Sequence, residues 1–260
     1  MGKEIKQIKD LLEKGDITMK GKKMVKQIIV LGGLMFSVII NIYAADIVSH
    51  WSFDEGSGTI VKDSVRNNNG EIQGSARYVD GKIGSALEFD GKTLVKVIDK
   101  DESGFSLTSM TLSAWIYIKD YPLPSSGYWA GIIGKNYYAG STYGLWLTYN
   151  KRLCFFAFNP ALGKEKEKIQ YFSKTPLEKN QWYHVVVTYD NSKVCFYVNG
   201  KLDSVHEETR VPEENKRNIF IGSIAENFGY FEGIIDEVKI FKGALTKKEV
   251  EAEYNCKLSK

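Results

Sequence analysis

Short runs in which apolar and polar side chains alternate recur along most of this chain. In the run MTLSAWIYI, the residues Leu112, Ala114, Ile116 and Ile118 alternate with Thr111, Ser113, Trp115 and Tyr117. The same pattern occurs in SALEFDGK, YGLWLTYN, LCFFAF, WYHVVVTYD, VCFYVNG, NIFIGS and GIIDEVKIF. A period of two is typical of a strand that places one face on a core. Because short turns such as Asn199-Gly200 separate these strands, the pattern predicts an all-β, two-sheet antiparallel sandwich.

The N-terminal segment has the pattern of an export signal. Four lysines, at positions 20, 22, 23 and 26, precede an apolar run from Ile28 to Ile40, and the small residues Ala44 and Ala45 follow it. This order predicts a secretory signal peptide, with an N-terminal extension plus signal in residues 1–44 and one domain in residues 45–260. The alternative is a retained membrane anchor, because the run from Ile28 to Ala45 reaches the lower length limit of a span. Met19 and Met24 are alternative start positions.

The charge of the chain is concentrated in that segment. Residues 1–44 contain eight Lys and four acidic residues, a net charge of +4, and the whole chain carries +3, which leaves −1 for residues 45–260. A domain of this charge has no basic surface that indicates nucleic-acid binding. We expect a protein that is secreted, periplasmic or held at the cell surface, with no membrane contact beyond the export signal.

Three cysteines follow the export segment, at Cys154, Cys195 and Cys256. Their odd number and wide spacing do not match a disulfide framework or a zinc site. Cys154 and Cys195 lie within expected strands, which favours burial as free thiols. A disulfide between them is the alternative in an exported protein.

One helix is expected, at the C-terminal end of the chain. Thr246 and Glu249 have the spacing of a capping box, and Leu245 with Val250 has that of a hydrophobic staple. Val250 and Tyr254 share one face of this helix. We expect it to dock on the edge of the sandwich.

Eight segments occur in an order that is similar to a known family. They are HWSFDEGSGT, DSVRNNNG, GKIGSALEFDG, TLSAWIY, NQWYHVVVTYD, VCFYVNGK, IFIG and GIIDEVKIFKGALTKKEVEAEY. From about Ile47 to Tyr254 the chain resembles the LamG-like jellyroll (laminin G type 3) domains of the concanavalin A-like lectin/glucanase superfamily. The resemblance implies two curved antiparallel sheets. It implies no single activity, because the fold serves lectins, adhesion modules, glycosidases and lyases.

A structural calcium ion is a second implication of the resemblance. Related modules hold Ca²⁺ with the acidic end of the first strand, an Asn/Gly loop and an Asp near the last strand, which here correspond to Asp54, Asn67 and Asp236. Carboxylates and loop carbonyls at a strand end are suitable ligands for this cation. Arg66 departs from the family pattern and weakens the expectation. The alternative is that Asp54 and Asp63 form hydrogen bonds within turns.

Aromatic residues are concentrated between Tyr128 and Tyr149, in a segment that is also rich in Gly and Ser. Such rings can stack on the apolar face of a sugar. We expect Trp129, Tyr138 and Trp146 to be exposed and to bind the ligand, with a glycan or a cell-surface polymer as the partner and a protein as the alternative. The competing interpretation is that these rings pack in the core, as expected for Trp115 and Trp182.

The sequence contains no convincing catalytic pattern. Glycoside hydrolysis needs two carboxyl groups at a fixed separation. The nearest candidate, Glu232 with Asp236 and Glu237, has the wrong spacing and matches the last strand of the family. There is no Gly-x-Ser-x-Gly motif, and the three histidines, His50, His184 and His206, lack the spacing of metal ligands. We therefore predict a non-catalytic binding module, with a glycoside hydrolase or polysaccharide lyase of the same fold as the alternative.

Overall fold

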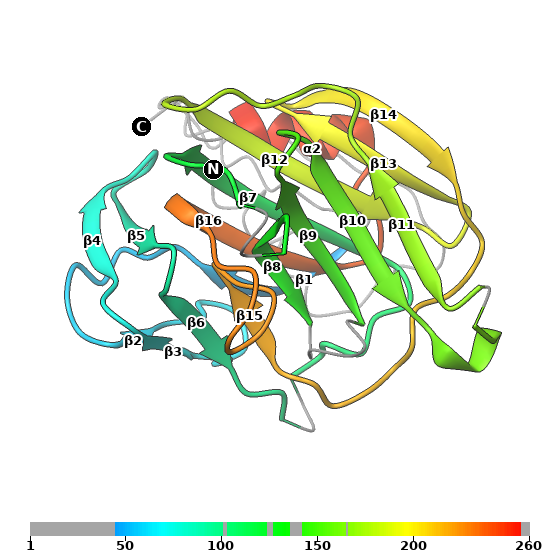
Figure 1. The fold of residues 1–260 in the computed structure, drawn as a ribbon. Coiled ribbons are helices and arrows are strands. Elements are labelled where there is room, and N and C mark those ends of the chain that lie inside the picture. The colour runs from blue at the N-terminus through cyan, green and yellow to red at the C-terminus, as the bar shows by residue number, and fades with distance from the viewer. Residues whose placement is uncertain (1–44, 101–102, 124–126, 136–141, 165, 256–260) are drawn as a thin grey trace, which may run out of the picture. The chain divides into compact units, whose positions relative to one another are not determined.

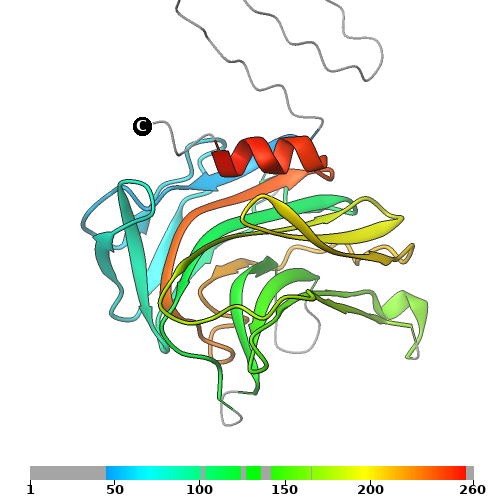
Figure 2. The ribbon, with the colours of Figure 1, turned by 90° about the horizontal axis from the view of Figure 1, so that it is seen from above.

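Two antiparallel sheets packed face to face form the domain (Figures 1 and 2). The computed structural model describes residues 45–100, 103–123, 127–135, 142–164 and 166–255. The predicted all-β jellyroll sandwich with a short C-terminal helix is confirmed. The expected signal segment, residues 1–44, lies outside the described residues. Within the described residues, no helix is long and apolar enough to cross a membrane.

The first sheet, sheet A, is built around the long strand β16. Its order is β14 (Lys201–Glu207), β13 (Lys193–Val198), β12 (Trp182–Tyr189), β7 (Met110–Ile118), β16 (Glu232–Lys242), β5 (Ser85–Asp90) and β4 (Arg77–Asp80). Strand β1 (Asp46–Trp51) also pairs with β16, so the two ends of the domain's sequence lie side by side. A register shift between Asp236 and Lys239 interrupts the pairing of β16 with β7.

The second sheet, sheet B, carries the aromatic segment of the sequence. Its order is β11 (Lys168–Phe172), β10 (Leu153–Phe158), β9 (Tyr143–Thr148), β8 (Trp129–Lys135), β15 (Ile219–Ile221), β6 (Leu94–Val97), β3 (Gly70–Gln73) and β2 (Ile60–Val61). A single 3-10 turn, η2 (Pro160–Leu162), follows β10 in the described part of the chain.

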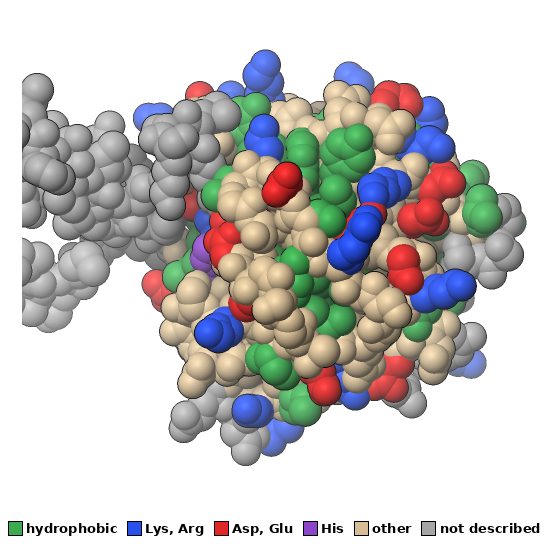
Figure 3. All heavy atoms as spheres, turned by 90° about the vertical axis from the view of Figure 1, so that its left-hand side faces the viewer, with side chains coloured by type: hydrophobic (Ala, Val, Ile, Leu, Met, Phe, Trp, Pro, Cys, Tyr) green, Lys and Arg blue, Asp and Glu red, His purple; other side chains and the backbone are tan. Residues whose placement is uncertain are grey.

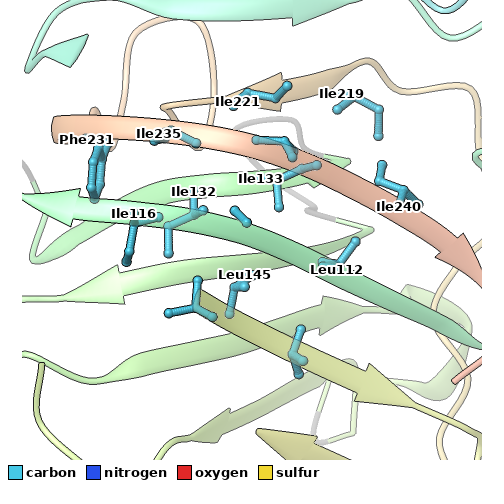
Figure 4. Packing of buried hydrophobic residues seen from close by; sticks show 14 of the residues in the cluster. Leu112, Ile116, Ile132, Ile133, Leu145, Ile219, Ile221, Phe231, Ile235 and Ile240 are labelled. Atoms are coloured by element: carbon cyan, nitrogen blue, oxygen red, sulfur yellow. The ribbon is translucent and has the colours of Figure 1, made fainter. Parts of the chain in front are cut away.

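The core lies between the sheets and is formed by the inward half of each alternating strand. Figure 4 shows residues of β7, β16, β8, β9 and β15 meeting there, among them Leu112, Ile116, Ile132, Ile133, Leu145, Ile219, Ile221, Ile235 and Ile240. All of these side chains are fully buried. The alternation in the sequence therefore assigns the inward face of each strand, and the intervening residues point away from the core.

The C-terminal helix α2 (Lys247–Asn255) begins at the expected capping box. The backbone N–H of Thr246 donates to Glu249 Oε2 at 2.7 Å, and the N–H of Glu249 donates to Thr246 Oγ1 at 3.3 Å. The helix lies on the outer face of sheet A rather than at its edge (Figure 2). There Tyr254 stacks on Trp115 with ring centroids 5.5 Å apart, and Lys239 Nζ lies 2.6 Å from Glu253 Oε2.

The structure corrects two expectations about tryptophans. Trp115 is buried, but beneath the helix and not between the sheets, because it points outward from β7. Trp182 is only half-buried and packs edge-on against Tyr117.

The expectation for the cysteines is confirmed, since Cys154 and Cys195 are buried free thiols in different sheets.

Surface charges of both signs are mixed on the side of the domain that includes β4 and β5. Figure 3 shows acidic and basic side chains interspersed there. One such group joins Glu88 of β5 to both Arg77 of β4 and Lys119.

Candidate ligand-binding face

Aromatic side chains gather on the outer face of sheet B, where β8, β9, β10 and β11 run side by side. The inward residues of these strands, such as Leu145, Leu147 and Phe155, belong to the core. Their neighbours therefore point outward, and four of them define what we call the aromatic face: Trp129, Trp146, Phe156 and Phe172. Strand pairing places Trp146 opposite Cys154 and Cys154 opposite Phe172, so the rings come from adjacent strands.

The rings of the aromatic face contact one another directly. Trp146 stacks on Phe156 with centroids 4.7 Å apart and an interplanar angle of 14°. Trp129 meets Trp146 edge-on at 5.6 Å and lies 6.1 Å from Phe172. Trp129 and Phe156 are half-buried, Phe172 is 36% exposed, and Trp146 is 6% exposed. The face thus has an upper layer of accessible rings and one supporting ring beneath them.

Two glycines permit close packing beside the supporting ring, Gly144 against the indole and Gly131 against the neighbouring backbone. Gly144 lies opposite Phe156, and a Cβ atom at Gly144 would come within 2.5 Å of Trp146 Nε1. Gly131 lies opposite Trp146, and a Cβ atom there would come within 2.1 Å of the carbonyl oxygen of Ser223. Larger residues at these positions would displace the indole or the neighbouring backbone. The local sequence therefore fixes the orientation of the ring.

The segment between β15 and β16 packs against one side of this cluster. Ile224 and Phe228 contact it, and the backbone N–H of Ile224 donates to the carbonyl of Phe228 at 3.2 Å. Glu226 of the same segment forms an ion pair with Lys96 of β6. This segment is therefore held by a backbone hydrogen bond within it and by an ion pair to sheet B.

The structure brings together two of the three residues that were expected to bind the ligand. Trp129 and Trp146 lie in contact, whereas Tyr138 lies outside the described residues. Trp146 is buried under its neighbours and not exposed as expected. Among the rings of the segment that the structure describes, Tyr128 and Tyr149 are the more exposed, at 45% and 56%, and they pack edge-on with centroids 5.0 Å apart.

Phe156 and Phe172 were not predicted as residues of this face. A signal was present in LCFFAF, where apolar residues occupy both alternating sets of positions. A strand with two apolar faces is covered on both sides or exposes an apolar surface.

The residues expected to bind calcium are brought together only in part. Asp54 Oδ1 accepts the backbone N–H of Ser85 at 2.9 Å, and Asp236 Oδ2 accepts that of Ile83 at 2.9 Å. Both carboxylates therefore lie at the turn between β4 and β5. Asn67 lies in another loop with a φ of 66°, and the hydrogen bonds of its neighbour Asn68 run to Ser49 and Ser103.

Asp63 makes the turn hydrogen bonds that were the alternative to a metal site. Its carboxylate accepts the backbone N–H groups of Val65, Arg66 and Asn68 at 3.0–3.1 Å. Among the residues that the structure describes, no three acidic, His or Cys side chains converge as a metal site would require. Asp54 and Asp236 supply two carboxylates, so Ca²⁺, which takes 6–8 oxygens, would need loop carbonyls and water as well.

A two-sheet antiparallel jellyroll is an architecture that lectin domains share with proteins of other functions. The family model for the concanavalin A-like lectin/glucanases superfamily matches residues 89–251, and the chain belongs to this superfamily. No curated protein sequence matches the chain.

Solved structures share the fold at low sequence identity. Domain 4 of AbnA, an extracellular arabinanase from Geobacillus stearothermophilus solved with arabinotriose, has a TM-score of 0.62 and 22% identity, over 80% of this chain and 97% of that domain. The binding domain of Paraclostridial Mosquitocidal Protein 1 has a TM-score of 0.67 and 18% identity, over 82% and 53%. The botulinum neurotoxin serotype G binding domain has a TM-score of 0.61 and 14% identity, over 82% and 52%. The chain spans about half the length of these two toxin domains.

Proposed function

We propose that this chain is an exported, non-catalytic carbohydrate-binding module that holds its ligand on the aromatic face. The observation that carries the proposal is the contact between the partly accessible rings of Trp129 and Phe172 on one side of sheet B. Aromatic rings offer large apolar contact area and a favourable geometry for the C–H face of a sugar ring. The arabinanase domain solved with arabinotriose supports a glycan as the partner.

The lack of acidic residues on the described strands of the aromatic face supports binding without catalysis. The outward positions of β8 to β11 carry no Asp or Glu, as the strand register and the sequence together show for these described strands. Hydrolysis of a glycosidic bond needs a pair of carboxyl groups beside the bound sugar. A sugar on this face would meet rings, amides, hydroxyl groups and the Lys168 ammonium group instead of carboxylates.

The proposal also includes export through the N-terminal segment and one structural calcium ion. The pattern in residues 24–44 supports cleavage near Ala45 or Asp46, and N-terminal sequencing of secreted protein tests it. Recovery of the apolar segment in the membrane fraction would contradict cleavage. The shared turn of Asp54 and Asp236 supports a structural cation there.

The binding function is tested with a glycan array and with variants of the accessible rings. We expect Trp129→Ala and Phe172→Ala each to weaken binding roughly two- to tenfold, as the loss of one stacking contact predicts. Leu202→Ala is the matched control, because Leu202 is 43% exposed on β14, in the other sheet. Equal binding by all three variants would refute the aromatic face as the site.

A further inference from the structure

Three exposed basic residues lie on or beside the strands of the aromatic face: Arg152, Lys168 and Lys174. Lys168 lies on β11 opposite Phe158, so it shares the outward side of sheet B with Phe156 and Phe172. Arg152 directly precedes β10, and its backbone N–H donates to Thr148 Oγ1 at 3.1 Å, beside the pairing of Thr148 with Trp129. Arg152 is two positions before Cys154, which packs against Trp146, so the alternation of β10 places Arg152 on the same side.

A third cation, Lys174, follows Phe172 by two positions. Its backbone N–H donates to Asp203 Oδ2 at 2.5 Å, and that of Thr175 donates to Asp203 Oδ1 at 3.0 Å. The Asp203 carboxylate also accepts the hydroxyl of Ser204 at 3.0 Å. Asp203, the acidic residue that contacts the backbone of Lys174, is therefore already hydrogen-bonded to backbone and hydroxyl groups.

The side chains of Arg152, Lys168 and Lys174 are exposed. Among the described residues, none of the three takes part in a salt bridge, whereas Lys96, Lys119 and Lys151 each have an acidic partner. Unpaired lysines also occur elsewhere, for example Lys92 and Lys201, so a missing partner alone does not mark a site. The aromatic face differs because three exposed cations lie on or next to strands that carry contacting rings and no outward carboxylate.

We infer that the ligand of the aromatic face is an anionic glycan, a chain whose sugars carry carboxylate or sulfate groups. This inference rests on the proposed carbohydrate-binding function. Lys168 and Phe172 begin and end β11, four positions or roughly 13 Å apart along the strand, and Lys174 lies in the bend that follows it. A chain several sugars long can therefore stack on the rings in the middle and present its anions to the cations at both ends. A neutral glycan would use the rings and leave the cations without a partner.

The test compares three oligosaccharides of similar length on the full chain by calorimetry. An oligogalacturonate carries carboxylates, a heparin fragment carries sulfates, and an arabino-oligosaccharide is neutral. We expect one or both acidic probes to bind more tightly than the neutral probe, and to bind less tightly as salt is raised, because surface charges are screened over about 8 Å at physiological ionic strength. A preference between the two acidic probes identifies the anion.

The variant that tests the cations is the triple substitution Arg152→Gln, Lys168→Gln and Lys174→Gln. We expect a loss of roughly tenfold or more for the acidic probe, as three exposed ion pairs predict, and little change for the neutral probe. The matched control is Lys92→Gln, Lys201→Gln and Lys248→Gln, which removes the same charge from exposed positions on other elements.

Each of the other outcomes would refute a defined part of the inference or of the proposed function. An equal loss in both triple variants, or no loss in the first, would refute the role of the three cations. Binding of the neutral probe as tight as that of the acidic probes would refute the anionic class and leave the proposed function standing. If the parent protein binds none of the three oligosaccharides and no glycan of the array, both proposals are wrong.

Discussion

The indole of Trp146 lies nearly parallel to the ring of Phe156, with centroids 4.7 Å apart. The two residues come from adjacent strands, and Phe156 is paired with Gly144 and not with Trp146 itself. Because Gly144 has no side chain, the indole can extend over it toward Phe156, with Nε1 where a Cβ would clash. Trp146 thus supports the aromatic face from below, while Trp129 and Phe172 remain accessible to a ligand.

This arrangement predicts that Trp146 and Trp129 differ in what they contribute. We expect Trp146→Ala to lower the free energy of unfolding by about 3–5 kcal/mol, the usual cost of removing a buried tryptophan. Trp129→Ala should cost less, because Trp129 is half-buried, and should mainly weaken ligand binding. Urea denaturation and calorimetry on the same two variants separate these effects. A larger loss of stability in Trp129→Ala than in Trp146→Ala would contradict the assignment.

Local patterns in the sequence were sufficient for much of the fold. Alternation identified the inward residues of β7, and the capping box identified the first turn of α2, because both signals depend on neighbours within a few positions. The sequence also placed Trp129 and Trp146 in one segment. Adjacent strands joined by one connection bring such residues together without any long-range information.

Other features depend on contacts between distant segments. Trp115 points away from the core, and its burial depends on Tyr254 in a helix at the far end of the domain's sequence. Phe172 joins the aromatic face only because β11 pairs with β10 in a register that places Phe172 opposite Cys154. Asp54 accepts a hydrogen bond from Ser85, whereas Asn68, which follows Asn67, donates to Ser103, so the two loops have different partners. Alternation fixes which side a residue faces, but not which element covers that side.

The two buried thiols should be unreactive in the native protein. Burial raises the pKa of the Cys154 thiol, and burial also raises that of Cys195. A higher pKa leaves little thiolate at pH 8, and the thiolate is the reactive form. In a Cys256→Ser background, which removes the cysteine outside the described residues, we expect almost no labelling by iodoacetamide at pH 8 and full labelling after unfolding. Rapid labelling of either thiol without unfolding would show that the native sheets open locally.

The ion pairs of Glu88 should make stability depend on pH in the acid range. Hydrogen bonds from Lys119 and then from Arg77 hold the pKa of the Glu88 carboxyl below its usual value. A carboxyl whose pKa is lower in the folded state stabilises the fold above its unfolded pKa, and this contribution is lost as the pH falls through the folded pKa. We expect Glu88→Gln to be less stable than the parent at pH 7 in urea denaturation, and the difference to shrink as the pH is lowered below about 4.3. A difference that stays constant from pH 7 to pH 3 would contradict this role. The control is Glu71→Gln, at an exposed position of β3.

Calcium should raise the melting temperature through the turn between β4 and β5. A ligand that binds the native state alone stabilises it by about 2.7 kcal/mol at a concentration 100 times its Kd. The gain arises because the ion would tie Asp54, which follows β1, to Asp236 in β16, and so connect distant parts of the chain. We expect melting several degrees higher in Ca²⁺ than in EDTA, and loss of this shift in Asp236→Asn and in Asp54→Asn.

Two control variants separate this site from its surroundings. Asn67→Ala should retain the shift, because Asn67 lies in another loop. Asp63→Asn should lower stability equally with and without calcium, because its carboxylate accepts hydrogen bonds from backbone N–H groups. A parent protein that melts at the same temperature in Ca²⁺ and in EDTA would exclude a calcium ion at this turn.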